Sequence, residues 1–335
     1  MKISKIGING FGRIGRQLTK LLLGSENIKI AAINDLSDIK TSSHLFKYDT
    51  SYGQFNGKVE SNENQIIING EKINKISEKD PSKINWSDYD VDIVVESTGI
   101  FTKKSEASKH LNGTVKKVII SAPATDEDIT IVLGVNDQNY DENNHNIISN
   151  ASCTTNCVAP MVKVINDQFG IKNALMSTIH SFTNDQSVLD QPHSDLRRAR
   201  TASENIIPTT TGAAKAVVNV IPEMKGKIDG MAYRVPTASV SVTDLTFSLE
   251  KDTDVDELNN ELKKASETYL RNIIQYCTDP LVSQDFKGNS NSVIIDSLST
   301  IQTSNGLFKV VGWYDNEWGY ANRTFDLVKL ISSKL

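Results

Sequence analysis

The chain has 335 residues, of which 38% are hydrophobic and 23% are charged, a composition typical of a globular protein large enough for two domains. Its 36 basic and 41 acidic residues give a net charge of -5 without a basic tail or stripe, which argues against a nucleic-acid partner. The sequence has no secretory pattern and no apolar stretch near the roughly 20 residues that span a bilayer. Three cysteines are too few for a disulfide framework, so we expect a cytoplasmic protein. Any specific role of a cysteine thiol should then be chemical and not structural.

The first half alternates short apolar runs with helical stretches, which is typical of a parallel sheet covered on both faces. The expected strands are 3–8, 28–34, 92–97, 118–121, 129–135 and 146–149, and the expected helices are 12–23 and 103–110. Between them, Asn69-Gly70 predicts a hairpin turn joining 65–69 to 72–76. We expect this hairpin to be an excursion from the parallel core.

The second half has longer strands in which apolar and polar residues alternate, a pattern that favours an antiparallel sheet with one face covered by helices. The expected helices are 155–169, 212–220, 255–270 and 317–331, and the expected strands are 174–182, 228–235, 239–249, 293–295 and 307–314. The stretch 183–208 is expected to be irregular.

Together these patterns predict an α/β protein of two domains. We expect a Rossmann-type domain with a parallel sheet over residues 1–152, and an α+β catalytic domain with a mostly antiparallel sheet over residues 153–315. The C-terminal helix, within residues 316–335, carries apolar side chains on one stripe. We therefore expect it to pack back onto the first domain.

A glycine-rich run follows the first expected strand and opens the first expected helix. It reads Gly10-Phe-Gly-Arg-Ile-Gly15, and Asp35 follows the next strand about 20 residues further on, the spacing of the dinucleotide-binding fingerprint. Gly10 permits a tight turn, Gly12 lets the backbone approach a pyrophosphate, and the start of a helix favours the anion. Asp35 would accept hydrogen bonds from ribose hydroxyls and repel a 2′-phosphate. The sequence therefore predicts NAD rather than NADP. The alternative is that the glycines form an ordinary turn and that Asp35 is a surface aspartate.

Cys153 lies at the junction of an expected strand and an expected helix, four residues before Cys157. Exposed N–H groups and the dipole at the start of a helix would stabilise a thiolate, and such junctions open onto the ligand crevice of a parallel sheet. His180 falls in the strand that returns after this helix, so we predict a thiolate–imidazolium pair. The alternatives are a small core cysteine and a core histidine without a catalytic role. Cys157 is expected to be a packed helix residue, and no metal site is predicted.

Seven motifs together resemble the glyceraldehyde-3-phosphate dehydrogenase family over essentially the whole chain. They are Asn9-Gly-Phe-Gly-Arg-Ile-Gly-Arg16, Ala151-Ser-Cys-Thr-Thr-Asn-Cys157, Thr178-Ile-His-Ser-Phe-Thr-Asn-Asp-Gln186, Asp195-Leu-Arg-Arg-Ala-Arg200, Pro208-Thr-Thr-Thr-Gly-Ala-Ala-Lys215, Arg234-Val-Pro-Thr237 and Trp313-Tyr-Asp-Asn-Glu-Trp-Gly-Tyr320. The resemblance implies a glycolytic NAD enzyme that converts D-glyceraldehyde 3-phosphate and inorganic phosphate to 1,3-bisphosphoglycerate and NADH. It also implies a homotetramer, in which the stretch 183–208 lines the cofactor pocket of a neighbouring subunit.

The resemblance further implies roles for single residues. Cys153 resembles the nucleophile that forms a thioester, and His180 resembles the residue that activates it. The implied cofactor contacts are Gly10, Gly12, Arg13, Ile14, Asp35, Lys79, Ser121 and Asn316. The implied substrate-phosphate contacts are Thr183 and Arg234, with Asp185 orienting the arginine, and the implied contacts of inorganic phosphate are Ser152, Thr154, Arg198, Thr211 and Gly212. Lys79 and Ser121 stand where relatives often have arginine and threonine, but they keep the charge and the hydroxyl.

Three other functions fit parts of this pattern. A dehydrogenase of another phosphorylated aldehyde, such as erythrose 4-phosphate, would share the cysteine, the histidine and the cofactor site. Arg198 with Thr211-Gly212 favours the enzyme that uses inorganic phosphate. A non-catalytic NAD-binding protein would not need the cysteine and the histidine together, and a cysteine hydrolase would leave Asp35 and the glycine fingerprint without a purpose.

Overall fold

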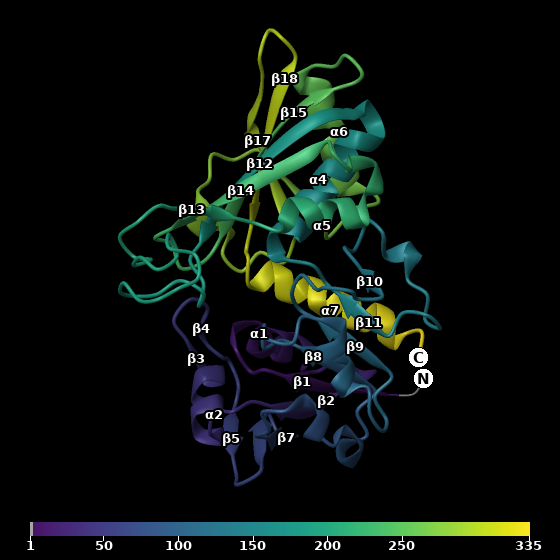
Figure 1. Ribbon diagram of the computed structural model, residues 1–335, viewed down its shortest axis with the longest axis vertical. Helices are drawn as coiled ribbons and strands as arrows, with labels where there is room; N and C mark the ends of the chain where they lie inside the picture. The colour runs from purple at the N-terminus through teal and green to yellow at the C-terminus, as the bar shows by residue number, and fades with distance from the viewer. Residues whose placement is uncertain (1–2) are drawn as a thin grey trace. The chain divides into compact units, whose positions relative to one another are not determined.

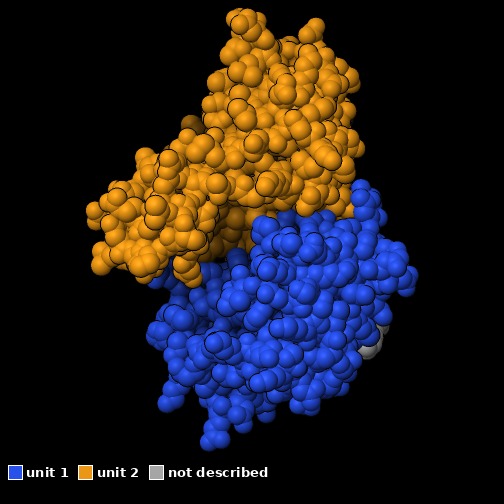
Figure 2. Space-filling model, in the orientation of Figure 1, with its two compact units in different colours: residues 1–131, 138–151, 321–335 blue, residues 132–137, 152–320 orange. Residues whose placement is uncertain are grey.

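The structure is a computed structural model that describes residues 3–335. Contacts within the chain divide it into two compact units, each built around its own sheet (Figures 1 and 2). Unit 1 runs to Ile131 and takes in Gln138–Ala151 and Ala321–Leu335, whereas unit 2 comprises Val132–Asp137 and Ser152–Tyr320. The chain therefore passes from one unit to the other directly before Ser152.

Unit 1 contains, within the described residues, a nine-stranded sheet. Its strands, in spatial order, are β10 (Ile129–Thr130), β11 (Ile147–Ser149), β9 (Lys117–Ile120), β8 (Ile93–Glu96), β1 (Ser4–Asn9), β2 (Ile28–Asn34), β7 (Glu71–Ile76), β6 (Gln65–Ile68) and β5 (Val59–Ser61). The strands from β10 to β7 pair in parallel. Apolar residues at the centre of this sheet, such as Ile8, Val94 and Ile119, are fully buried, which confirms the parallel core expected from the uninterrupted apolar runs.

The helices of unit 1 connect its strands, as a Rossmann-type sheet requires. They are α1 (Arg13–Leu22), α2 (Ile39–Lys47), α3 (Lys104–Ala107) and the short 3-10 helices η1 (Pro81–Lys83), η2 (Trp86–Tyr89), η3 (Ser108–His110) and η4 (Asp137–Asn139). A small ladder of β3 (Tyr48–Asp49) and β4 (Gly53–Gln54) follows α2. The last helix, α7 (Trp318–Ser332), belongs to unit 1 from Ala321 onward. In this unit Ser332 donates a hydrogen bond to Ser4, and Asn150 donates one to Thr324.

Three expectations for unit 1 differ from the structure. The hairpin forms at Asn69 and Gly70, which have φ angles of 51° and 88°, but β7 pairs with β2, so the hairpin extends the sheet and is not an excursion from it. The strand expected over 129–135 ends after Thr130, and the chain then turns at Gly134 (φ 78°). Helix α2 was not expected, since its residues are mostly polar; the Asp38 side chain caps it by accepting a hydrogen bond from a backbone N–H.

Unit 2 contains, among the residues described, a seven-stranded sheet covered on one face by helices (Figure 1). Its strands, in spatial order, are β13 (Ile207–Thr210), β14 (Ile228–Val235), β12 (Ile171–Ser181), β15 (Ser241–Leu249), β18 (Leu307–Tyr314), β17 (Val293–Gln302) and β16 (Ile274–Cys277). The helices are α4 (Cys153–Phe169), α5 (Ala213–Val220), α6 (Val255–Glu267) and the 3-10 helices η5 (Pro222–Met224) and η6 (Ser283–Phe286). Four of the six strand pairings are antiparallel, which confirms the expected mostly antiparallel sheet.

The boundaries in unit 2 shift where side chains or strained backbone end an element. Helix α4 begins at Cys153, two residues earlier than expected, because the Ser152 side chain caps it. Strand β15 begins at Ser241 and not at residue 239, directly after Val240, whose φ of 68° is incompatible with a strand. The edge strands β13 and β16 were not expected, and β17 continues well past residue 295.

Strand β12 determines which side chains meet helix α4. Its alternate residues Met176, Thr178 and His180 are buried, whereas Leu175 on the opposite face is 66% exposed. Since side chains in a strand alternate between the two faces, His180 lies on the face that α4 covers. The sheet register thus carries a histidine to the helix that starts with Cys153.

Candidate active site

A cavity of about 750 Å³ lies in unit 1 at the ends of strands β1, β2 and β8. Four of the expected cofactor residues, Gly10, Gly12, Asp35 and Lys79, line it. The carboxyl ends of parallel strands are where dinucleotides bind in doubly wound sheets. The cavity therefore lies where the glycine fingerprint places it.

The glycine turn is shaped by close backbone approaches. Gly10 has a φ of 97°, and a Cβ there would lie 2.7 Å from the backbone nitrogen of Thr98. A Cβ on Gly15 would lie 2.1 Å from the carbonyl oxygen of Gly10. A Cβ on Gly12 would meet no protein atom within 4 Å. Gly10 and Gly15 are therefore required by the fold, whereas Gly12 leaves open a path for a ligand to the start of α1.

Asp35 is held as an ionised acceptor at the rim of this cavity. Its carboxylate accepts hydrogen bonds from the Phe11 N–H at 2.8 Å and from the Ser37 N–H and hydroxyl at 2.9 and 2.5 Å. Burial raises the pKa of Asp35, but the bonds from Ser37 and Phe11 outweigh burial, so the pKa is lowered overall. A fixed carboxylate with further lone pairs suits the ribose hydroxyls of a dinucleotide.

The remaining expected cofactor residues lie outside the lining of the cavity. Arg13 and Ile14 form the first turn of α1, and Arg13 makes an ion pair with Asp49 at 2.7 Å. Ser121 follows β9 and donates a hydrogen bond to the Glu96 carbonyl at 3.1 Å. Asn316 belongs to unit 2, where the Ser241 hydroxyl donates to its Oδ1 at 3.1 Å. The bond to Oδ1 turns the amide N–H donors of Asn316 away from Ser241.

A buried polar cluster supports the cavity from within the sheet. The Glu96 carboxylate accepts hydrogen bonds from Asn9 at 2.5 Å and from the Thr98 N–H at 2.8 Å, and lies 3.1 Å from His110 Nε2. Trp86 donates its indole N–H to His110 Nδ1 at 3.1 Å, so the ring proton of His110 is on Nε2 and is donated to Glu96. His110 is fully buried, although the residues around it in the sequence are mostly polar. Because Asn9 and Thr98 line the cavity, this cluster fixes its wall.

The cysteine and the histidine that were expected to react meet in unit 2. Cys153 Sγ lies 3.4 Å from His180 Nε2. Ser152, the N-cap of α4, accepts a hydrogen bond from the Thr155 N–H at 3.0 Å, and Ala151 before it has a φ of 54°. This turn places Cys153 at the first position of α4, where the residue stays partly exposed. Cys157, one turn later, is buried, as expected of a packed residue.

The surroundings of the pair favour its neutral forms. Burial raises the pKa of the Cys153 thiol, although the charge of Arg234 opposes this effect. Burial and the same arginine lower the pKa of His180 to about 3. In the protein alone, burial thus favours the neutral thiol and imidazole over the expected thiolate–imidazolium pair, since separated charges are disfavoured away from water. The short contact instead provides a path for a proton between sulfur and nitrogen.

Arg234 lies beside His180 because the two residues are register partners on the parallel strands β14 and β12. Its Nη1 lies 2.5 Å from His180 Nδ1 and 3.1 Å from the Ser181 carbonyl oxygen, which is also 2.6 Å from Nδ1. The Nε of Arg234 is buried without a hydrogen-bond partner among the described residues. An arginine with unused donors beside a reactive pair is suited to bind an anion.

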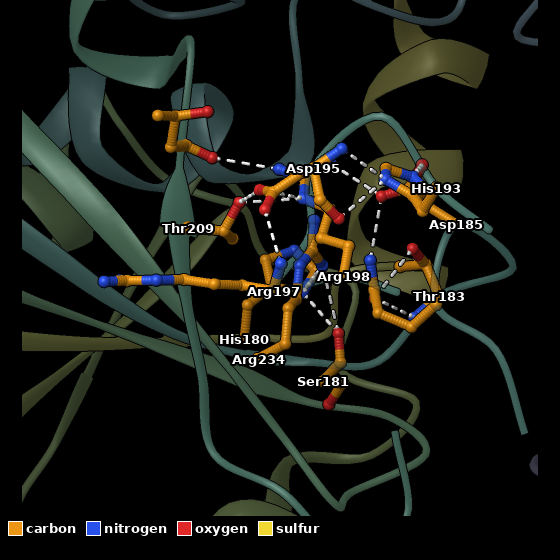
Figure 3. A network of polar contacts seen from close by, with 12 residues as sticks. His180, Ser181, Thr183, Asp185, His193, Asp195, Arg197, Arg198, Thr209 and Arg234 are labelled. Atoms are coloured by element: carbon orange, nitrogen blue, oxygen red, sulfur yellow. Dashed lines mark hydrogen bonds and ion pairs between the residues drawn. The ribbon is translucent and has the colours of Figure 1, made fainter. Parts of the chain in front are cut away.

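A second cationic cluster lies next to these residues, as Figure 3 shows. Arg198 makes an ion pair with Asp185 at 2.6 Å and donates hydrogen bonds to the Thr209 hydroxyl at 2.8 Å and to the Thr210 carbonyl at 3.0 Å. Asp185 was expected to orient Arg234, but it binds Arg198 and also contacts His193 at 3.3 Å. The irregular segment 183–208 thus pairs Asp185 with Arg198.

The other expected phosphate contacts are engaged locally. Thr183 contacts the Gln186 side chain, and Thr211 accepts a hydrogen bond from a backbone N–H in the first turn of α5, which Gly212 caps. Thr154 shares the hydroxyl of Tyr314 with Thr178, both at 2.8 Å. Tyr314 is fully buried, and its ring stands edge-on to that of His180 at 5.9 Å between centroids.

Several supporting residues escaped the sequence reasoning. Tyr314 was part of a quoted motif, but nothing in the motif indicated that its hydroxyl joins α4 to β12. The Ser181 hydroxyl donates to the carbonyl of Val240 at 2.7 Å, and the Ser181 N–H donates to the hydroxyl of Ser241 at 3.0 Å. Val240 is a β-branched residue with a positive φ, a strained conformation that often marks functional sites.

Two kinds of feature are absent from the described residues. The part of the chain that the structure describes has no group of three or more histidine, cysteine, aspartate or glutamate side chains able to hold a metal ion. In that same part, no helix is both long enough and apolar enough to cross a membrane.

Comparison with known proteins decides the family. Residues 4–104 match the family model described as glyceraldehyde 3-phosphate dehydrogenase, NAD binding domain, and residues 152–316 match the C-terminal domain of the same family. The chain belongs to the glyceraldehyde-3-phosphate dehydrogenase family. It is 57% identical to glyceraldehyde-3-phosphate dehydrogenase 1 of Bacillus cereus over 99% of each chain, and 55% identical to the Geobacillus stearothermophilus enzyme over 98% of each chain. The family confirms an oxidoreductase with an NAD-binding domain, as the sequence predicted.

The glycine turn generates a first prediction. Gly12→Ala should leave the thermal unfolding temperature unchanged, because the added Cβ meets no protein atom, but it should weaken NAD binding by obstructing the pyrophosphate. Gly15→Ala should lower both the unfolding temperature and the affinity for NAD, since its Cβ collides with the Gly10 carbonyl. The collision should reduce the free energy of unfolding by roughly 1–3 kcal/mol. Calorimetric titration with NAD and thermal unfolding measure the two effects. Equal loss of stability in both variants would contradict the separate roles of the two glycines.

The neutral state of His180 generates a second prediction. Its pKa of about 3 in the folded chain lies below the value of about 6.5 in an unfolded chain. Between these values the unfolded state binds the extra proton, so stability should fall as pH is lowered through this window. His180→Gln removes this contribution. The wild-type protein should therefore lose more thermal stability than the variant between about pH 7 and pH 5; equal losses would show that His180 is not held neutral.

Proposed function

We propose that the chain catalyses the glycolytic oxidation of D-glyceraldehyde 3-phosphate with NAD and inorganic phosphate, through a thioester on Cys153. The observation that carries this proposal is the 3.4 Å contact between Cys153 Sγ and His180 Nε2 at the first residue of α4. A thiol at the start of a helix, with a base in contact, is the arrangement of an activated cysteine nucleophile. The family membership supplies the substrate class.

In the proposed reaction, His180 takes the thiol proton and the sulfur of Cys153 attacks the aldehyde carbon. The backbone N–H groups at the start of α4 and the His180 imidazolium stabilise the oxygen anion of the resulting hemithioacetal. His180 donates its proton to this anion to form the hydroxyl of the hemithioacetal. The neutral ring then takes the hydroxyl proton back as a hydride leaves the carbon, and a thioester remains on Cys153. When bound, NAD supplies the acceptor for the hydride that leaves the same carbon. Inorganic phosphate finally cleaves the thioester to give 1,3-bisphosphoglycerate.

We assign the substrate phosphate to Arg234 and Thr183. Arg234 makes no ion pair with any carboxylate in the described residues and has a buried Nε without a partner, so a bound phosphate would satisfy donors that the protein leaves unused. We assign inorganic phosphate to Arg198, Ser152, Thr154, Thr211 and Gly212. In support of the second assignment, Thr211 and Gly212 open helix α5, whose first N–H groups suit an anion.

We assign the adenosine half of NAD to the cavity lined by Gly10, Gly12, Asp35 and Lys79. The fixed Asp35 carboxylate supports NAD over NADP, because it would repel a 2′-phosphate. Arg13 and Ile14 lie in the first turn of α1, and Ser121 directly follows β9, in the same unit. We also assign Asn316 to the nicotinamide, since its amide N–H groups are turned away from Ser241.

We further propose that residues 1–152 with the C-terminal helix act as the NAD domain, and that residues 153–315 act as the catalytic domain of a cytoplasmic homotetramer. The division into two units supports this boundary. Four apolar side chains of the segment 183–206 are 68–81% exposed, namely Val188, Leu189, Leu196 and Ile206. Apolar surface of this kind is typical of an interface between chains.

The covalent route predicts that Cys153→Ser abolishes dehydrogenase activity and leaves NAD binding nearly intact, because the hydroxyl is a far weaker nucleophile than the thiolate. His180→Asn should lower kcat by roughly 100- to 10,000-fold and slow the alkylation of Cys153 by iodoacetamide. On purified protein, NADH absorbance measures the dehydrogenase activity, and mass spectrometry measures the alkylation of Cys153. Substantial turnover by the serine variant would refute the thioester.

The choice of substrate is tested by phosphate dependence. NADH formation from glyceraldehyde 3-phosphate should continue over many turnovers only with inorganic phosphate, since the thioester otherwise accumulates on Cys153. Glyceraldehyde 3-phosphate should be preferred to erythrose 4-phosphate in kcat/KM. Equal turnover without phosphate, or a preference for the longer aldehyde, would instead support the related dehydrogenase.

A further inference from the structure

The ring of His193 lies between two aspartates of the segment 183–208, which also carries Arg198 (Figure 3). Its Nε2 is 3.3 Å from the Asp185 carboxylate. Its Nδ1 is 2.9 Å from the backbone nitrogen and 3.2 Å from the carbonyl oxygen of Asp195. No further ion pair or hydrogen bond of a side chain reaches this ring within the described residues. The charged groups that act on the ring are therefore Asp185 and, behind it, Arg198.

Both charge states of the His193 ring find partners in this position. Nε2 faces a carboxylate, which only accepts hydrogen bonds, so Nε2 carries a proton in either state. In the neutral ring, Nδ1 accepts a hydrogen bond from the Asp195 N–H. In the imidazolium, Nδ1–H can donate to the Asp195 carbonyl oxygen instead. His193 can therefore gain a positive charge while it stays beside Asp185.

Asp185 connects His193 to the cation that we assign to inorganic phosphate. The Oδ2 atom of Asp185 lies 2.6 Å from Nη1 of Arg198, and Asp195 adds a second carboxylate at 3.5 Å from Nε of the same arginine. Two carboxylates thus face one guanidinium, so the cluster has an excess negative charge while His193 is neutral. This charge opposes the approach of a phosphate ion to Arg198.

Asp185 is the carboxylate that can respond to a charge on His193. Asp195 accepts a further hydrogen bond from the Thr209 hydroxyl at 2.6 Å, whereas the Asp185 side chain is 43% exposed. Burial raises the pKa of Asp185, but the bonds from His193 and Arg198 outweigh burial, so the pKa is lowered overall. Asp185 therefore stays ionised over the pH range in which imidazoles change their charge.

We propose that His193 acts on the inorganic phosphate site through Asp185, and that its imidazolium form strengthens phosphate binding by competing with Arg198 for the carboxylate. His193 is then a positioning residue, since it reaches the phosphate only through Asp185. The affinity for inorganic phosphate rises as a falling pH protonates the ring, in addition to any effect of the ionisation of phosphate itself. This inference rests on the proposed function, because it takes Arg198 as a ligand of inorganic phosphate.

The test compares the KM for inorganic phosphate of the full-length wild type with that of His193→Gln, whose side chain keeps an N–H donor but cannot be charged. His44→Gln, which removes an exposed histidine from unit 1, is the matched control. NADH formation with saturating NAD and glyceraldehyde 3-phosphate is measured at about pH 5.5 and about pH 8, on either side of the usual titration of an imidazole. The ionisation of phosphate is the same for every protein in one buffer, so the ratio of KM values isolates the side chain.

The KM of His193→Gln should be roughly threefold higher than that of the wild type at the lower pH, because a single partly screened charge is lost. The two KM values should be equal at the higher pH, where both side chains are neutral. The kcat at saturating phosphate and the NADH formed in the first turnover without phosphate should not change. In an Asp185→Asn background, His193→Gln should have no effect on KM, since the carboxylate through which it acts is gone.

A purely structural role of His193 predicts that KM rises by the same factor at both pH values. That result, a ratio near one at both, or an equal change in His44→Gln would overturn the inference. Phosphorus NMR titration of each protein with inorganic phosphate gives the same comparison without turnover. A wild type that forms no NADH would therefore count against the proposed function alone, and the titration would still decide whether His193 acts on phosphate.

Discussion

The contact between Cys153 and His180 depends on two backbone segments that are fixed independently and meet at one point. Helix α4 supplies the sulfur from its first residue, after Ala151 turns the chain with a φ of 54° and Ser152 caps the helix. Strand β12 supplies the imidazole from the face that α4 covers. A shift of β12 by one residue would turn His180 to the exposed face. The neighbours of β12 in the sheet, β14 and β15, therefore take part in the chemistry by holding this register.

Burial affects the pair of Cys153 and His180 in two opposite ways. It brings the thiol and the imidazole into contact, but it also disfavours their charged forms, and Arg234 adds to this effect at His180. A protein that kept the pair permanently ionised would need a stronger compensating charge than these neighbours provide. The surroundings thus suit a nucleophile that forms its charge during the reaction. The positive φ of Val240 and the two serine hydroxyls near it hold the Ser181 carbonyl where the ring needs it.

Features that depend on neighbouring residues in the sequence could be predicted, whereas features that depend on distant partners could not. The glycine run and Asp35 follow from spacing and periodicity, and the structure places them at the cavity, whereas helix α4 begins two residues before the predicted start because of the Ser152 cap. The burial of His110 could not be predicted, because it depends on Glu96 and Trp86, which become partners only in the folded chain. The ion pair of Asp185 with Arg198 could not be predicted for the same reason, since an irregular segment gives no periodicity from which to infer the direction of a side chain. Edge strands such as β13 lack the apolar pattern of a sheet interior, so they were missed.

The cluster around Glu96 also gives the protein an optical probe. Trp86 is fully buried, and its indole N–H is bonded to His110, which is bonded in turn to the carboxylate that holds the Thr98 N–H. Only two side chains therefore separate this chromophore from the wall of the nucleotide cavity. Indole emission is sensitive to the polarity and hydrogen bonding around the ring, so a displacement of Thr98 would be transmitted to the fluorescence of Trp86. Replacing Trp313 and Trp318 by phenylalanine would leave a single emitter inside unit 1.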